Sequence, residues 1–68
     1  MRISARNVLR GTVVEVKRGA TTAYVRIDVG GFVVTAAITN EAVDELGLRE
    51  GMQASAVVKA SDVMVAVD

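Results

Sequence analysis

The sequence predicts an all-β fold, a closed barrel of five strands with one short helix between the third and fourth strands. Most of the chain consists of short segments rich in β-branched residues, which favour the pleated surface of a sheet. One segment, residues 22–29, alternates strictly between apolar and polar residues, as a strand with one buried and one wet face does. Only residues 41–46 have the flanking residues of a helix.

The first strand is expected over Val8–Lys17. Gly11 interrupts it, and a glycine inside a strand often marks a bulge or tight bend, which a barrel strand needs in order to curl. The turn that follows is expected over residues 18–21.

The second and third strands are expected over Thr22–Val29 and Phe32–Ile38, and Gly30-Gly31 between them is a typical signal of a tight hairpin. The apolar face of the second strand is expected in the core and comprises Ala23, Val25, Ile27 and Val29. The third strand has no properly polar face, so we expect both of its faces to be covered.

The helix is expected over Glu41–Leu46, with Thr39 or Asn40 capping its start. Gly47 suits the left-handed position that ends a helix, and Leu48 is expected to fold back onto Val43.

The fourth and fifth strands are expected over Met52–Lys59 and Val63–Val67, and the fifth is apolar on both faces. We expect Met52 and Met64 in the core. Three strands, a short helix and two strands is the order of a five-stranded OB-type barrel. An SH3-like barrel and a small sandwich are the alternatives, and the position of the helix favours the OB type.

The 68 residues are expected to form a single domain over 1–68, and a chain this short buries a small core. There is no cysteine for a disulfide and no histidine, the commonest metal ligand. Apolar residues make up 51% of the chain, more than so small a core hides. A homo-oligomer is therefore the expected source of further stability.

The charge balance and the termini limit the function classes. Eight basic and eight acidic residues give a net charge of zero, which argues against a general nucleic-acid binder. No apolar run approaches the roughly 20 residues of a membrane span, and no signal peptide precedes the first strand. We therefore expect a cytoplasmic protein that stands alone as a gene product. An enzyme is not expected, because the three serines have no histidine base.

Hydrogen-bond donors gather in two runs, one near each end of the chain, and no carboxylate lies within either run. The first run contains Ser4, Arg6 and Asn7, and the second contains Lys59, Ala60 and Ser61. If the fold brings the two runs together, they form a positive pocket of donors that suits a small oxyanion. The plainer alternative is that polar residues cluster where strands begin and end. Arg6 is then a structural ion-pair partner, and Lys59 is a solvated strand end.

The chain resembles the molbindins, small molybdate- and tungstate-binding proteins built from a single Mop, or TOBE-type, domain. The resemblance covers Met1 to Val67 and rests on the order and spacing of these motifs: Ser4-Ala5-Arg6-Asn7, Gly11, Gly19-Ala20, Thr35-Ala36-Ala37-Ile38-Thr39, Leu46-Gly47-Leu48, Gly51 and Lys59-Ala60-Ser61.

This resemblance implies an OB-type fold that pairs into dimers, with three dimers forming a hexamer that holds oxyanions at subunit interfaces. It implies a cytoplasmic role in molybdenum storage or homeostasis, and the same domain occurs in a molybdate-responsive regulator and in transporter ATPases. The metal arrives inside the oxyanion, so no side chain needs to ligate it. The residues that match the family's oxyanion site are Ser4, Arg6, Asn7, Thr39, Lys59, Ala60 and Ser61.

A second kind of interface site is implied at the turn Gly19-Ala20. Members of the family often carry asparagine after this turn, whereas this chain has Thr21 and Thr22, which leaves Thr22 and backbone donors to bind there. The alternatives to oxyanion binding are an OB-fold nucleic-acid-binding module and a purely structural oligomerisation module. The first lacks the stacking aromatics that single-strand binding needs.

Overall fold

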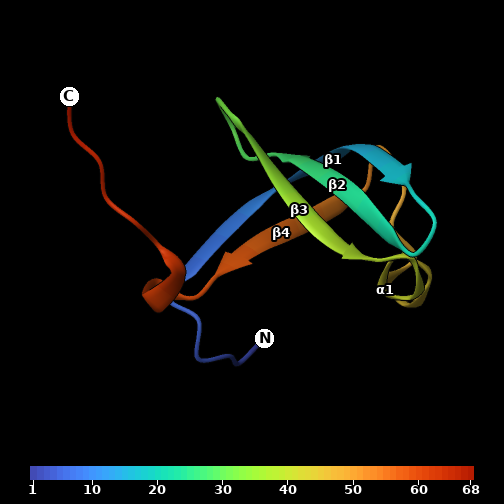
Figure 1. Ribbon diagram of the computed structural model, residues 1–68, viewed down its shortest axis with the longest axis horizontal. Coiled ribbons are helices and arrows are strands. Elements are labelled where there is room, and N and C mark those ends of the chain that lie inside the picture. The colour runs from blue at the N-terminus through green and yellow to red at the C-terminus, as the bar shows by residue number, and fades with distance from the viewer.

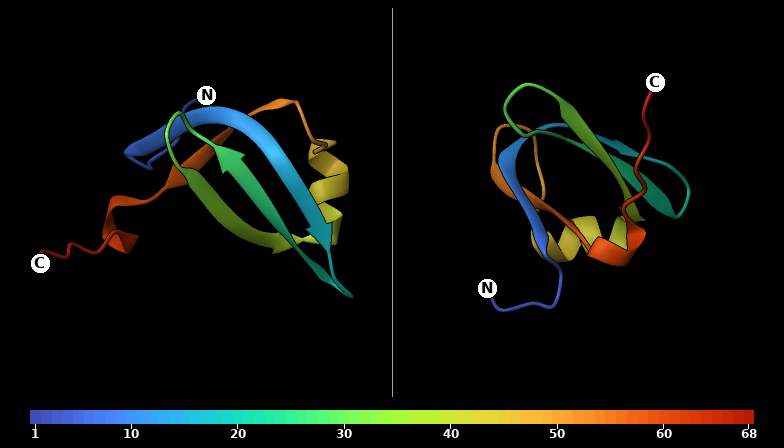
Figure 2. Two further views of the ribbon diagram at one scale, coloured as in Figure 1. Left: turned by 90° about the horizontal axis from the view of Figure 1, so that it is seen from above. Right: turned by 90° about the vertical axis from the view of Figure 1, so that its left-hand side faces the viewer.

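In the computed structural model, which describes residues 1–68, four antiparallel strands form one curled sheet in the order β3-β2-β1-β4 (Figure 1). The elements in chain order are β1 (Asn7–Arg18), β2 (Thr22–Asp28), β3 (Val33–Thr39), α1 (Asn40–Leu46), β4 (Gln53–Val58) and a short 3₁₀ helix, η1 (Ala60–Asp62). The sheet bends around its own inner face, and α1 lies against one end of it (Figure 2). The first four predicted strands and the helix are confirmed, with ends that differ by one residue.

The bend of β1 comes from a bulge at Val14, where the pairing with β2 shifts between Val13 and Glu15. The position of Gly11 in the sequence suggested that it would form the bulge or bend, but the bulge lies at Val14 instead. Gly11 lets β1 approach β2 closely: a Cβ atom at this position would collide with the Asp28 carbonyl and lie 2.9 Å from Cγ2 of Ile27. A bulge bends its strand and increases the local twist, so both features help the sheet to curl.

The predicted hairpin and helix ends are confirmed. Gly30 and Gly31 have φ angles of +92° and +121°, the region that glycine adopts without steric cost. Thr39 caps α1 through its hydroxyl oxygen, which accepts from the Ala42 N–H at 3.0 Å. Gly47 is left-handed, with a φ of +62°, and the Leu48 N–H donates to the Val43 carbonyl at 3.1 Å. No helix in the structure combines the length and the apolar character that crossing a membrane requires.

The core lies between the inner face of the sheet and α1. The alternation of β2 is confirmed, because Ala23, Val25 and Ile27 are buried while their neighbours on the strand are exposed. The other buried residues are Val13, Val43 and Ala56, so the whole core comprises 6 of 68 residues. Met52 packs against this core as expected. A single copy therefore leaves much of its apolar surface exposed.

The predicted fifth strand is wrong for a single chain. After β4 the chain enters η1, where Asp62 and Val63 donate backbone hydrogen bonds to Lys59 and Ala60 at 2.9 and 3.2 Å. These bonds turn the chain away from the sheet, and residues 63–68 extend alone to the C-terminus (Figure 1). Met64, expected in the core, is 93% exposed. The expectation that β3 is covered on both faces is also not met within one copy, because Val33 is 40% exposed.

Candidate functional site

The two runs of donors near the chain ends lie next to each other. Asn7, at the start of β1, pairs with Val58 at the end of β4, and its side-chain Nδ2 donates to the Val58 carbonyl at 3.1 Å. Lys59 follows Val58 directly, and η1 begins next to the start of β1 (Figure 1). The residues gathered here, which we call the terminal cluster, are Ser4, Arg6, Asn7, Lys59, Ala60 and Ser61.

The two cations of the terminal cluster have no acidic partner. The two ion pairs of the structure join Arg18 to Asp44 and Arg26 to Glu15, so Arg6 forms no ion pair within its own chain. All six residues of the cluster are exposed. The cluster therefore presents two positive charges and several unused donors on an open surface, where water competes for them.

Thr39 does not join the terminal cluster within one chain. It pairs with Thr22 across β2 and β3, at the end of the sheet where β1 reaches Arg18. Asn7 lies at the opposite end of β1. Thr39 lies instead beside the turn that was predicted as a second site, and we call Gly19, Ala20, Thr22 and Thr39 the hairpin cluster.

One local and two long-range interactions hold the hairpin cluster together. The Gly19 N–H donates to the Thr22 carbonyl at 2.7 Å, and Nδ2 of Asn40 donates to the Gly19 carbonyl at 3.0 Å. Arg18 forms an ion pair with Asp44 at 2.8 Å, which offsets the nearest positive charge. The sequence analysis assigned no role to Arg18 at this turn or to the Asn40–Gly19 bond. Their partners lie more than twenty residues away, so no short motif indicated them.

The Thr39 hydroxyl has two capacities. Its oxygen accepts the hydrogen bond that caps α1, and its hydrogen has no acceptor within the chain. Capping and donation to a ligand are therefore compatible at this residue, as the sequence suggested.

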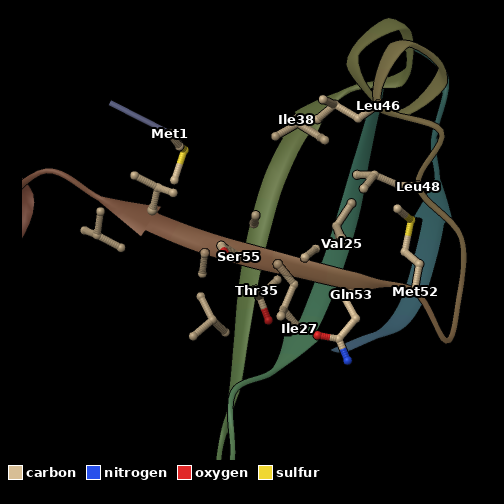
Figure 3. A pocket seen from close by; sticks show the side chains of 16 residues that line it. Met1, Val25, Ile27, Thr35, Ile38, Leu46, Leu48, Met52, Gln53 and Ser55 are labelled. Atoms are coloured by element: carbon tan, nitrogen blue, oxygen red, sulfur yellow. The ribbon is translucent and has the colours of Figure 1, made fainter. Parts of the chain in front are cut away.

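The largest hollow of the molecule is apolar and contains neither cluster. It is an open groove of about 700 Å³ that runs between β3 and β4 over the inner face of β2, and 13 of its 16 lining residues are hydrophobic (Figure 3). Val25 and Ile27 form its floor, and Leu46, Leu48 and Met52 close one end. An unpaired dianion is costly to bury among such side chains. We call this hollow the apolar groove.

Comparison with known proteins gives consistent matches over nearly the whole chain. Residues 3–65 match the TOBE domain. Molybdenum-pterin-binding protein 2 of Clostridium pasteurianum is 48% identical over 66 residues, which cover 96% of this chain and 97% of that protein. A molybdate-binding protein from Sporomusa ovata, known at high resolution, superposes with a TM-score of 0.95 at 39% identity and covers 98% of this chain and 100% of its own. The cytoplasmic molybdate-binding protein ModG, determined with molybdate bound, is 49% identical with a TM-score of 0.89, over 94% of this chain and 46% of ModG.

Proposed function

Because the chain belongs to the TOBE domain family, we propose that it is a molybdate- or tungstate-binding protein of the cytoplasm that serves in molybdenum storage or homeostasis. In this proposal the chain is one domain, is not an enzyme and binds the metal as an oxyanion. The observation that carries the proposal is the terminal cluster, where the pairing of β1 with β4 brings two unpaired cations together with hydroxyl and amide donors.

The chemistry of the terminal cluster matches a tetrahedral oxyanion. Molybdate is a dianion near neutral pH, and all four of its oxygens accept hydrogen bonds. Arg6 and Lys59 supply charged donors, and Ser4 and Ser61 supply hydroxyls. Ala60 and Ser61 are the first two residues of η1, and the backbone N–H groups at the start of a helix have no acceptor within that helix. Hydrogen bonds to charged groups contribute about 1.5–3 kcal/mol each, so a few of them reach the roughly 8 kcal/mol of a micromolar complex.

The exposure of both clusters supports a site between subunits. The terminal cluster is open on one side, and Thr39 lies at the other end of the sheet. A site that contains Thr39 together with Lys59 therefore takes Thr39 from a second copy. We propose a closed homo-oligomer, a hexamer built as a trimer of dimers, with oxyanions enclosed where the copies meet.

The second proposed oxyanion site, at the hairpin cluster, has fewer donors to offer. The Gly19 N–H already donates to Thr22, and Asp44 offsets the charge of Arg18. The Ala20 backbone and the Thr22 hydroxyl remain. We therefore propose that this site binds more weakly than the terminal cluster does.

Calorimetry and thermal denaturation test the proposal. A ligand at a hundred times its dissociation constant stabilises the folded state by about 2.7 kcal/mol, which raises the melting temperature of a domain this size by roughly 10–20 °C. We expect molybdate and tungstate to have this effect and phosphate to have less, because its protonated oxygen meets a donor. Sulfate has the same charge and shape as molybdate but shorter bonds. If equimolar sulfate raises the melting temperature as much as molybdate does, the site is a general anion site and does not select molybdate.

An oligonucleotide titration tests the nucleic-acid alternative in the same assay. The exposed aromatics Tyr24 and Phe32 are the only stacking groups that the chain offers. Because the net charge is zero, we expect no binding at physiological salt. Binding of the oligonucleotide without binding of molybdate would replace the proposal with this alternative.

A further inference from the structure

Asn40 connects the start of α1 to the turn between β1 and β2 through two hydrogen bonds (Figure 1). Its side-chain Nδ2 donates to the Gly19 carbonyl at 3.0 Å, and its backbone N–H donates to the Thr21 carbonyl at 2.9 Å. Asn40 is the first residue of α1, where a backbone N–H has no partner within the helix and can serve the turn instead. One residue therefore holds the carbonyl groups on both sides of Ala20.

Arg18 joins the same two segments from the other direction. It directly precedes the turn, and its guanidinium forms the ion pair with Asp44 of α1 and donates to the Asn40 carbonyl at 3.5 Å. The turn itself is exposed to solvent. Because α1 contacts the turn and Arg18 contacts α1, the Asn40 side chain stays within reach of Gly19 although the turn is exposed.

The bond from Asn40 to Gly19 sets the direction of the Ala20 N–H. A trans peptide unit is planar, with its carbonyl and its N–H on opposite sides, and the chain contains no cis peptide bond. Because the Gly19 carbonyl points to Asn40, the Ala20 N–H points away from Asn40. A hydrogen bond accepted by the carbonyl also polarises the peptide unit, which strengthens its N–H as a donor. The bond therefore both orients this donor and strengthens it.

The amide of Asn40 is poorly suited to a purely stabilising role. Its Oδ1 is buried and accepts no hydrogen bond from the chain. The reverse orientation of the amide would place Oδ1 against the Gly19 carbonyl oxygen, so the bond to Gly19 is made with Oδ1 left without a partner. A buried acceptor without a partner costs at least as much free energy as a neutral hydrogen bond contributes. The net effect of this amide on the stability of the chain is therefore small, and its specific effect is on the turn.

We propose that Asn40 is a positioning residue of the second oxyanion site: it holds the Ala20 N–H in place as a donor to a tetrahedral oxyanion and does not touch the anion itself. This inference rests on the proposed function, since it names the residue that prepares the hairpin cluster for its ligand. The hairpin cluster has few donors, and Asp44 offsets the nearest cation. A donor that is fixed before the anion arrives loses little conformational freedom on binding, which favours affinity at such a site.

Asn40→Leu tests the proposal, because it removes the amide with little change in volume and none in charge. A molybdate titration of the full-length protein is followed by NMR through the backbone amide signals of Ala20 and Ser61, which report on the hairpin cluster and the terminal cluster separately. In the parent, both signals should move. In Asn40→Leu, the molybdate concentration that gives half of the Ala20 shift should rise at least about tenfold. The corresponding concentration for Ser61 should stay within about twofold, because the two clusters lie at opposite ends of the sheet.

Thr21→Val is the matched control. It replaces a neutral polar side chain on the same turn and leaves the backbone carbonyl and the Asn40–Gly19 bond in place. Both titrations should then match those of the parent. Thermal denaturation without ligand separates positioning from structural support. Asn40→Leu should melt at the temperature of the parent or above it, because the unpaired Oδ1 is lost together with the bond.

The outcomes distinguish this inference from the proposed function. If the Ala20 titration of Asn40→Leu matches that of the parent, Asn40 does not position the site. A lower melting temperature together with weaker binding at both clusters would make Asn40 a structural residue and overturn the inference. If molybdate moves the Ser61 signal of the parent but not the Ala20 signal, the inference is wrong while the terminal cluster stands. If molybdate moves neither signal, the proposed function fails as well.

Discussion

Replacement of Lys59 by alanine is the most direct perturbation of the terminal cluster. Lys59 lies between β4 and η1, its side chain is exposed, and no carboxylate pairs with it. Its ammonium therefore contributes little to the fold, and its loss should appear almost entirely in ligand binding. The variant leaves Arg6 as the only cation of the cluster.

The magnitude follows from the lost charged hydrogen bond. Such a bond contributes about 1.5–3 kcal/mol, and each 1.4 kcal/mol changes a dissociation constant tenfold. The dissociation constant for molybdate should therefore rise about ten- to one-hundred-and-fifty-fold. Because the cluster is exposed in one copy, the lower end of this range applies unless a second subunit covers it.

Isothermal titration calorimetry with molybdate measures the effect, and urea denaturation without ligand checks that stability is unchanged within about 0.5 kcal/mol. Arg49→Ala is the matched control, since it removes one exposed positive charge outside both clusters. If Lys59→Ala binds molybdate as tightly as the parent, the terminal cluster is not the site. If Arg49→Ala weakens binding equally, the effect is one of net charge alone.

Three further predictions concern the scaffold. Ile27→Ala removes a buried side chain and should lower the free energy of unfolding, measured in urea, by about 2–5 kcal/mol. A loss of only about 0.5 kcal/mol would mean that β2 presents its other face to the core. Gly11→Ala should destabilise the protein more than Gly19→Ala. The new Cβ atom collides with the Asp28 carbonyl at position 11, whereas at position 19 it lies 3.1 Å from the Thr22 carbonyl. A lower melting temperature for Gly19→Ala than for Gly11→Ala would contradict the close approach of β1 and β2. Thr39→Ala should cost about 1 kcal/mol through the lost helix cap while Thr39→Ser keeps it, and equal melting temperatures for the two variants would show that the cap carries no weight.

The sequence by itself determined the features that depend on neighbouring residues. Alternation along residues 22–28 identified the buried face of β2, because side chains in a strand point to opposite sides in turn. The sequence also marked the ends of α1, with Thr39 or Asn40 as the acceptor at its start and Gly47 as the left-handed residue at its close, and the structure selects Thr39. The donor runs at the two chain ends could likewise be identified from their residue types, and the resemblance to the molbindins from the order and spacing of the quoted motifs.

The tertiary structure decided what depends on distant partners. Pairing of Asn7 with Val58 joins the two donor runs, whereas pairing of Thr22 with Thr39 puts Thr39 at the other end of the sheet. Gly11 serves a close approach to Asp28 and not the bulge, which depends on the register between β1 and β2. The apolar pattern of residues 63–67 indicated that this segment requires burial but not where it is buried. Hydrophobic burial is non-directional, so a pattern of valines specifies that water must be excluded without specifying which surface excludes it.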